Sequence, residues 1–214
     1  MTAFAILLGG RLVRTERLLR QLDGARFVAA DGGMVHAQTL DVLPEAWVGD
    51  FDSTPDSLLE RYPEIRRQTY PAEKALTDGE LAVELALSAG ASRLLLVGAM
   101  GGDRTDHGAA HLIHALALAD RGLDVVLTSG DEEGYPLRSG SRQIDLPAGC
   151  LFSVLGFTEL EGLSIENARY PLDDYFLPFG SSRTLSNVAD GEIGIRLRAG
   201  RAILMARPYD FTGV

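Results

Sequence analysis

The chain has 214 residues, which is enough for one large domain or two small ones. Apolar residues make up 46% and charged residues 23%, the composition of a globular protein with a substantial core. Thirty acidic and twenty basic side chains give a formal charge of −10, which argues against a non-specific nucleic-acid surface. A phosphate-rich small substrate remains compatible with this charge if a metal ion and a few cations offset the repulsion.

The sequence contains no feature typical of export or of membrane insertion. No basic start is followed by an apolar segment, and no apolar run approaches the roughly 20 residues of a spanning helix. The single cysteine, Cys150, excludes an internal disulfide and fits a reducing compartment. We therefore expect a cytoplasmic protein with no membrane partner, and a buried, inert thiol at Cys150.

Short apolar runs alternate with helix-like stretches in the first part of the chain. These runs cover residues 4–8, 27–30, 46–48, 94–97 and 125–127. Continuous apolar strands separated by helices are typical of a parallel sheet that is covered on both faces.

Two helices are marked within this part. Thr77 and Glu80 have the spacing of a capping box, which predicts that a helix begins at Thr77. Leu81 and Leu85, at positions i and i+4, predict the core-facing row of this helix. A second helix is expected over residues 107 to about 120.

Strand patterns replace helical ones after about residue 133. Residues 192–198 alternate polar and apolar side chains, as a half-exposed antiparallel strand does. Ala199 and Gly200 then predict a hairpin turn into residues 202–205. We expect an α/β domain over residues 1–133 and a small all-β domain over residues 134–214.

Acidic residues gather just after the predicted strands and at the capped helix. They are Asp31, Asp50, Asp52, Asp78, Asp103 and Asp106. Ligands of open parallel sheets bind beyond the carboxyl ends of the strands, so these side chains can converge on one crevice. Converging carboxylates repel one another unless a cation shares them, and oxygen ligands of this kind suit Mg²⁺.

Each of these residues also has a purely structural interpretation. Asp31 can form a turn, and Asp78 can stabilise the positive end of a helix. The pair Asp50 and Asp52 is more specific, because two aspartates at i and i+2 in a short loop can face one ion. We favour a metal role for that pair.

Cations and glycines lie near the same positions. Lys74 and Arg104 can each meet phosphate oxygens, although either can equally be a surface cation paired with a carboxylate. The pairs at residues 9–10 and 101–102 are glycines, which allow backbone N–H groups to approach phosphates closely. No G-x-x-x-x-G-K-[ST] motif is present, so this is not a P-loop enzyme.

Three histidines, His107, His111 and His114, fall on one face of the second predicted helix. A transition-metal site is conceivable there, but no further ligand accompanies them. Partly buried polar side chains on an alanine-rich helix explain them equally well.

Taken together, these motifs resemble the thiamine pyrophosphokinase family nearly from end to end. In the first domain they are residues 30–33 (Ala-Asp-Gly-Gly), 49–53 (Gly-Asp-Phe-Asp-Ser), 73–82 (Glu-Lys-Ala-Leu-Thr-Asp-Gly-Glu-Leu-Ala) and 101–107 (Gly-Gly-Asp-Arg-Thr-Asp-His). In the second they are residues 170–172 (Tyr-Pro-Leu), 177–182 (Leu-Pro-Phe-Gly-Ser-Ser) and 185–187 (Leu-Ser-Asn).

The resemblance implies an α/β nucleotide-binding domain followed by a β-sandwich domain. It also implies a homodimer with thiamine sites between subunits. The implied reaction moves the pyrophosphoryl group of ATP to the hydroxyl of thiamine, giving thiamine diphosphate and AMP.

The resemblance also implies a role for each matching residue. Mg²⁺ and the triphosphate would be held by Asp50, Asp52 and Asp78. The nucleotide and its phosphates would be contacted by Gly9, Gly10, Asp31, Gly32, Lys74, Thr77 and Arg104. Asp106 would face the reacting centre, and Ser186 and Asn187 would hydrogen-bond the aminopyrimidine of thiamine. Asp106 is our hypothesis for the proton acceptor, with Asp78 next.

The chain departs from the family pattern at three places. Ala75 stands where the family commonly has an acidic residue, so the metal has one ligand fewer or does not need it. Met34 and Val35 replace the usual Ala-Asn. The glycine-rich loop is one residue longer, so Asp103 competes with Asp106, and the Arg-x-Asp-His order favours Asp106.

Three other functions stay open at this stage. A related pyrophosphokinase would act on another alcohol, such as a hydroxymethyl pterin. A metallophosphohydrolase would use the aspartates and histidines to bind two metals and activate water. A non-catalytic sensor of thiamine or nucleotide is the third, and Ala75 is its only hint.

Overall fold

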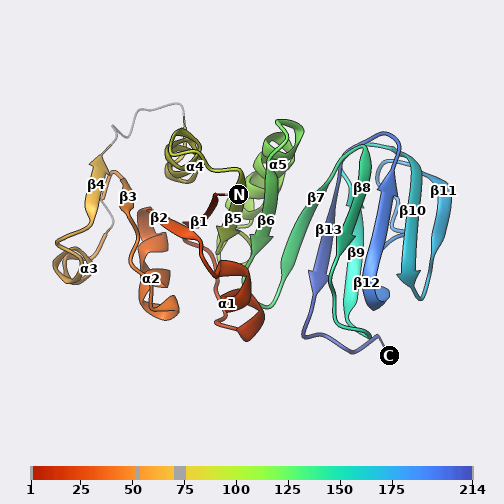
Figure 1. Ribbon diagram of the computed structural model, residues 1–214, viewed down its shortest axis with the longest axis horizontal. Coiled ribbons are helices and arrows are strands. Elements are labelled where there is room, and N and C mark those ends of the chain that lie inside the picture. Colours follow the sequence, from red (N-terminus) through yellow and green to blue (C-terminus); the bar gives the residue numbers. More distant parts are fainter. Residues whose placement is uncertain (1, 52–53, 70–75, 214) are drawn as a thin grey trace. The chain divides into compact units, whose positions relative to one another are not determined.

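The computed structural model describes residues 2–51, 54–69 and 76–213. It confirms the expected mixed α/β fold, shown in Figure 1, and its contacts divide the chain into two compact units. Unit 1 comprises Met1–His111 and Leu123–Gly130, and unit 2 comprises Leu112–Gly122 and Asp131–Val214. Among the described residues, no helix has the length and apolar character needed to span a membrane.

A parallel sheet forms the centre of unit 1. Its strands are β1 (Ala3–Leu7), β2 (Arg26–Ala30), β3 (Ala46–Gly49), β4 (Arg66–Thr69), β5 (Arg93–Val97) and β6 (Asp124–Thr128). They lie side by side in the order β4-β3-β2-β1-β5-β6, and each neighbouring pair is parallel. The five apolar runs are thus confirmed as strands. The polar edge strand β4 was not predicted.

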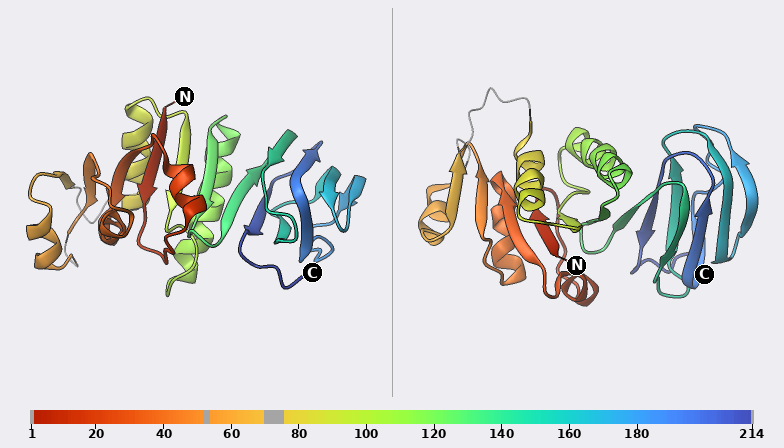
Figure 2. Two further views of the ribbon diagram at one scale, coloured as in Figure 1. Left: turned by 60° about the horizontal axis from the view of Figure 1, so that its bottom comes forward. Right: turned by 45° about the horizontal axis from the view of Figure 1, so that its top comes forward.

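Helices cover both faces of this sheet, as parallel strands require. Those of unit 1 are α1 (Glu16–Leu22), the 3₁₀ turn η1 (Asp31–Met34), α2 (Val35–Leu40), α3 (Asp56–Arg61) and α4 (Asp78–Ser88). A further helix, α5 (Thr105–Asp120), begins in unit 1 and continues into unit 2. Figures 1 and 2 show α4 on one face of the sheet and α1 and α2 on the other. On the latter face, Leu18, Leu22, Ala37 and Leu40 pack against buried side chains of the strands.

The predicted capping box at the start of α4 is confirmed. The Thr77 hydroxyl accepts a hydrogen bond from the Glu80 backbone N–H at 3.3 Å, and the Glu80 carboxylate accepts one from the Thr77 N–H at 2.8 Å. The predicted core-facing row was wrong, because Ala82, Val83 and Ala86 are the buried residues of α4. Small side chains allow this helix to lie close to β1, β2 and β3.

The strands of unit 2 are antiparallel. They are β7 (Glu133–Leu137), β8 (Gly140–Ile144), β9 (Leu151–Gly156), β10 (Leu160–Ala168), β11 (Leu172–Leu177), β12 (Asn187–Leu197) and β13 (Ala202–Arg207). One group pairs β8 with β12, β12 with β10 and β10 with β11. The other pairs β7 with β13 and β13 with β9, and the first two residues of β12 also pair with β9. Cys150 is buried beside β9, as predicted.

The predicted hairpin between residues 192–198 and 202–205 was wrong. The first segment lies in β12, which pairs with β8 and β10, whereas the second lies in β13, between β7 and β9. The segment between β12 and β13 is hydrogen-bonded to other parts of the chain. The Glu161 N–H donates to the Ala199 carbonyl, and the Phe157 N–H donates to the Arg201 carbonyl. These bonds fix the segment that connects one group of strands to the other.

Replacing Thr77 with alanine should lower the free energy of unfolding of unit 1 by about 1 kcal/mol, because the first turn of α4 loses its side-chain cap. Thr77→Ser keeps the hydroxyl and should remain close to wild type. Urea unfolding followed by the fluorescence of Trp47, the only tryptophan, measures the difference. Equal stability of the alanine and serine variants would contradict the prediction.

Candidate functional site

The strand order of unit 1 has a switch point, which indicates where a ligand would bind. The chain builds outward from β1 through β2, β3 and β4 on one side and then continues with β5 and β6 on the other. The switch point therefore lies between β1 and β5, and ligands of open α/β sheets bind beyond the carboxyl ends of strands at such a point. The loops that follow β1 and β5 contain both glycine pairs singled out from the sequence.

These loops pack backbone against backbone. A Cβ atom on Gly10 would lie 2.3 Å from the Gly98 carbonyl oxygen, and one on Gly33 would lie 2.1 Å from that of Leu7. The Gly10 N–H donates to the Gly98 carbonyl at 3.0 Å. No side chain can be accommodated at these positions, so the ends of β1, β2 and β5 are held together by main-chain contact.

Gly9 and Gly32 differ from Gly10 in this respect. A Cβ on Gly32 would meet no atom within 4 Å, and one on Gly9 would approach only the backbone of η1, at 3.8 Å. Packing within the described chain therefore does not require glycine at either position. Both glycines are exposed.

A buried histidine, which sequence reasoning missed, contacts the loop that follows β1. His36 on α2 is 7% exposed, and its Nε2 lies 2.8 Å from the Gly10 carbonyl oxygen. Because a carbonyl only accepts, Nε2 carries the proton and donates. Burial lowers the pKa of His36, opposed by its hydrogen bonds to the Gly10 and Leu8 carbonyls. Its position just after the Asp-Gly-Gly motif was the only available clue.

Asp31 and Asp50 follow neighbouring strands of the sheet. Asp31 begins η1 after β2, and Asp50 directly follows β3, which pairs with β2 in parallel. Both are half-buried. A Cβ on Gly49 would lie 3.4 Å from the Asp31 Cα, an ordinary contact that shows how closely the two loops approach. The structure therefore brings these two predicted residues to one edge.

The first turn of α4 reaches the same edge. A Cβ on Gly79 would lie 2.9 Å from a methyl carbon of Leu8, which follows β1, so Thr77 and Asp78 begin their helix beside the end of that strand. The Thr77 hydroxyl donates to the Glu80 carboxylate at 2.9 Å and so already takes part in the helix cap. Asp78 is half-buried.

Two predicted residues, Asp52 and Lys74, lie outside the described residues, and so does Ala75. Over residues 2–51, 54–69 and 76–213, no three His, Cys, Asp or Glu side chains are arranged to hold a metal ion. Mg²⁺ commonly takes only one or two protein carboxylates and completes its shell with water and phosphate oxygens. The hard oxygen donors of Asp50 and Asp78 fit that requirement.

Arg104 and Asp106 are joined to each other at the end of the β5 loop and the start of α5. Arg104 Nε donates to Asp106 Oδ1 at 3.0 Å and Nη2 to Oδ2 at 2.8 Å. Through these bonds the guanidinium holds the pKa of the Asp106 carboxyl well below its usual range. A carboxylate held in this way is a weak proton acceptor while the pair stays closed.

The histidines of α5 are partly explained by packing. His111 Nδ1 donates to the Ala99 carbonyl at 2.9 Å, and burial lowers the pKa of His111. The rings of His107 and His111 meet edge to face, with centroids 6.4 Å apart. No described group of ligands completes a metal site with them.

In unit 2, Asn187 has a structural partner. Its Oδ1 accepts from the Tyr170 N–H at 3.0 Å and its Nδ2 donates to the Tyr170 carbonyl at 2.9 Å. The side chain is 3% exposed and holds the turn before β11 against the start of β12. Ser186 is exposed, has a left-handed φ of 56°, and donates its N–H to the Ser153 hydroxyl.

The fold and the site together define an α/β protein with acidic side chains at the carboxyl ends of its parallel strands, the place where such sheets bind nucleotides. A family model described as "Thiamin pyrophosphokinase, catalytic domain" matches residues 20–127. The chain belongs to the thiamin pyrophosphokinase family.

Solved structures share the fold along the whole chain. The thiamine pyrophosphokinase from Bacillus subtilis has a TM-score of 0.84 and 20% identity, covering 96% of this chain and 99% of its own. That from Geobacillus thermodenitrificans has a TM-score of 0.82 and 23% identity, covering 100% of both chains. The yeast enzyme has a TM-score of 0.76 and 14% identity, covering 97% and 86%. No curated protein matches in a direct sequence comparison.

Replacing Arg104 with glutamine should raise the pKa of Asp106 toward its ordinary value near 3.9, because the carboxylate loses its charged partner. The carboxyl ¹³C shift of Asp106, followed by NMR as a function of pH, measures the change. Arg93→Gln, which disrupts the distant pair with Asp124, is the matched control and should leave Asp106 unaffected. An unchanged pKa in the Arg104 variant would show that the pair does not persist in solution.

Proposed function

We propose that this chain is a Mg²⁺-dependent thiamine pyrophosphokinase that transfers the pyrophosphoryl group of ATP to the hydroxyl of thiamine. The products are thiamine diphosphate and AMP, so attack occurs at the β-phosphorus. The observation that carries the proposal is the meeting of Asp31, Asp50 and the first turn of α4 at the carboxyl ends of β1, β2 and β3. Family membership supplies the substrates.

Asp50 and Asp78, with Asp52, are the residues we assign to Mg²⁺. When bound there, the ion would supply positive charge that offsets the charge of the triphosphate. The carboxylates of these residues would hold the ion at the carboxyl ends of the strands. Phosphoryl transfer depends chiefly on positioning and charge neutralisation, so residues that fix the phosphates carry most of the catalytic effect.

We assign the nucleotide itself to the loops around the switch point. Their exposed glycines, Gly9 and Gly32, leave space for it, whereas Gly10 sets the spacing of the loops. Asp31 adjoins the nucleotide, and Lys74, Thr77 and Arg104 contact phosphates.

Asp106 is our candidate for accepting the hydroxyl proton, and Asp78 is the alternative. The pair with Arg104 disfavours proton acceptance by Asp106, because it stabilises the ionised carboxylate. Binding of the Arg104 guanidinium to phosphate would relieve that effect.

We propose that residues 134–214 form a β-sandwich that binds thiamine and that a cytoplasmic homodimer completes its site. Residues 1–133 form the ATP-binding domain. The exposed side chains Tyr170, Phe176 and Phe179, which are 61%, 52% and 72% accessible, support a role for this part in binding aromatic or apolar groups. Ser186 carries the hydroxyl for thiamine, and Asn187 fixes the backbone around it.

Incubation with ATP, Mg²⁺ and thiamine should produce AMP and thiamine diphosphate in equal amounts, measured by chromatography. Asp50→Asn should reduce kcat/KM by at least about a hundredfold, since removal of one strong electrostatic contact to the transition state costs that much. Asp23→Asn, which removes an exposed carboxylate after α1, is the matched control.

Three outcomes of this assay would contradict the proposed function. ADP as the product would indicate transfer of a single phosphoryl group. Turnover without thiamine, or preference for another alcohol, would indicate a different acceptor. Activity on phosphate esters without ATP would indicate a metal-dependent hydrolase.

Ser186→Gly should raise the KM for thiamine about fivefold, the value of one hydrogen bond, while stability stays close to wild type. Glycine is chosen because it adopts the left-handed φ of this position without strain. Asn187→Ala should instead lower the free energy of unfolding by about 1–3 kcal/mol, because the Tyr170 backbone loses its partners. Thermal melts and steady-state kinetics separate the two effects, and a reversed pattern would exchange the roles.

A further inference from the structure

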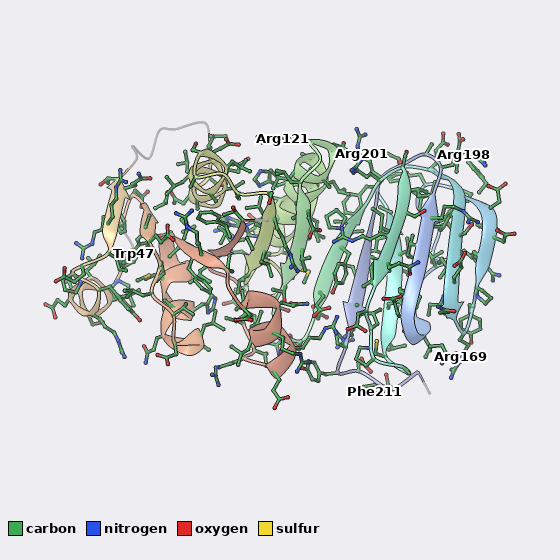
Figure 3. All side chains as sticks on the ribbon, in the orientation of Figure 1. Trp47, Arg121, Arg169, Arg198, Arg201 and Phe211 are labelled. Atoms are coloured by element: carbon green, nitrogen blue, oxygen red, sulfur yellow. The ribbon has the colours of Figure 1, made fainter. Side chains whose placement is uncertain are left out.

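One buried side chain, Trp47, contacts two of the loops at the sheet edge. It lies on β3, is fully buried and belongs to the core on the face covered by α1 and α2. Figure 3 marks its place within unit 1. Its only polar group, the indole N–H, donates to the backbone carbonyl of Asp31 at 2.9 Å. The indole thus reaches from its own strand to the end of β2.

The ring of Trp47 also fixes the loop that follows its own strand. Phe51 meets it edge to face, with ring centroids 5.1 Å apart and an angle of 83° between the planes. Such a geometry is favoured by the charge distribution of aromatic rings. Phe51 packs against the same core and stands between Asp50 and Asp52 in the metal-binding motif.

Asp31 and Phe51, the two loop residues that Trp47 contacts, both have a left-handed backbone. Asp31 has a φ of 42° and Phe51 a φ of 63°. The other non-glycine residues with positive φ in the described part of the chain are aspartate, asparagine or serine, whose small side chains tolerate this region better. A phenylalanine adopts it only where surrounding contacts impose it, and such imposed conformations concentrate at functional sites.

We propose that Trp47 is a positioning residue for the nucleotide and metal site. One indole fixes the backbone of both loops through its hydrogen bond to Asp31 and its ring contact with Phe51. It thereby sets where the carboxylates of Asp31 and Asp50 stand relative to each other. This inference rests on the proposed function, because it assigns those carboxylates to Mg²⁺ and ATP. Trp47 itself touches no reacting atom.

A purely structural role would produce a different pattern of effects. A core tryptophan that only fills space would, when altered, reduce stability without changing affinity for one substrate over the other. Substitution of a residue that fixes the conformation of the two loops should weaken the affinity for Mg–ATP and leave the KM for thiamine unaltered. The two possibilities therefore separate in a comparison of binding with stability.

Three variants test the proposal. Trp47→Phe keeps an aromatic ring but removes the N–H donor to Asp31, and Phe51→Leu keeps apolar volume but removes the ring contact. Phe27→Leu is the matched control, because Phe27 packs against the same core but lies at the start of β2, away from the loops. Circular dichroism and thermal melts establish that each variant folds.

Binding is measured with Mg²⁺ and α,β-methylene ATP, whose α–β bridge resists cleavage. Calorimetric titration should give Trp47→Phe and Phe51→Leu dissociation constants about tenfold above wild type, as expected if imposed backbone geometry is lost. Phe27→Leu should stay within about twofold at a comparable loss of stability. Because Trp47 is the only tryptophan, its emission gives a second measure in wild type, Phe51→Leu and Phe27→Leu.

Steady-state kinetics completes the comparison. The KM for ATP should rise in the two loop variants while that for thiamine stays within about twofold. In the double variant Trp47→Phe/Phe51→Leu, the loss should be well below the product of the single losses, because both act on one assembly.

The outcomes distinguish this inference from the proposed function. Absence of Mg–nucleotide binding and of AMP formation in the wild type would overturn the proposed function and, with it, this inference. Normal wild-type binding and turnover, with loop variants that behave like Phe27→Leu, would overturn only the role of Trp47.

Discussion

Main chain packed directly on main chain, where β1, β2 and β5 end, is the contact on which the rest of the site depends. Gly10, Gly33 and Gly98 leave no space for a side chain between these loops. The loops consequently lie at the spacing of the strands themselves, about 4.8 Å. Side chains that follow neighbouring strands must then share a narrow edge. Aspartates placed there repel one another, and a divalent cation is the simplest way to relieve that repulsion.

Charge near the site is partly balanced by an ion pair. The protein has an excess of ten negative charges, and its nucleotide substrate is also an anion. Arg104 is engaged with Asp106 in a two-point ion pair. Any phosphate bound by Arg104 therefore competes with that carboxylate for the same donors. Under the proposed function, the electrostatics of the site would therefore change on substrate binding, because Arg104 would exchange Asp106 for phosphate.

Sequence patterns predicted what depends on local periodicity and on motif order. Apolar runs gave the buried parallel strands, and the capping box gave the start of α4, because both signals are contained in a few neighbouring residues. The polar strand β4 escaped, since an edge strand needs no apolar run. The hairpin was wrong because Ala199 and Gly200 allow a turn but do not determine which strands pair. The contacts of His36, Trp47 and Asn187 join residues 16 to 26 positions apart, so only the folded chain reveals them.

The placement of β13 has a consequence for how the polypeptide acquires its structure during synthesis. This strand lies between β7 and β9, although it is made some fifty residues after β9 begins. Until Arg207 has left the ribosome, both partners have an unpaired edge, and such edges favour aggregation. In unit 1, β1 likewise waits for β5, which begins about 90 residues after it, but all the parallel strands have emerged by Thr128. Slow translation or early termination near the last strand would therefore expose the β-rich half while the α/β half is already assembled.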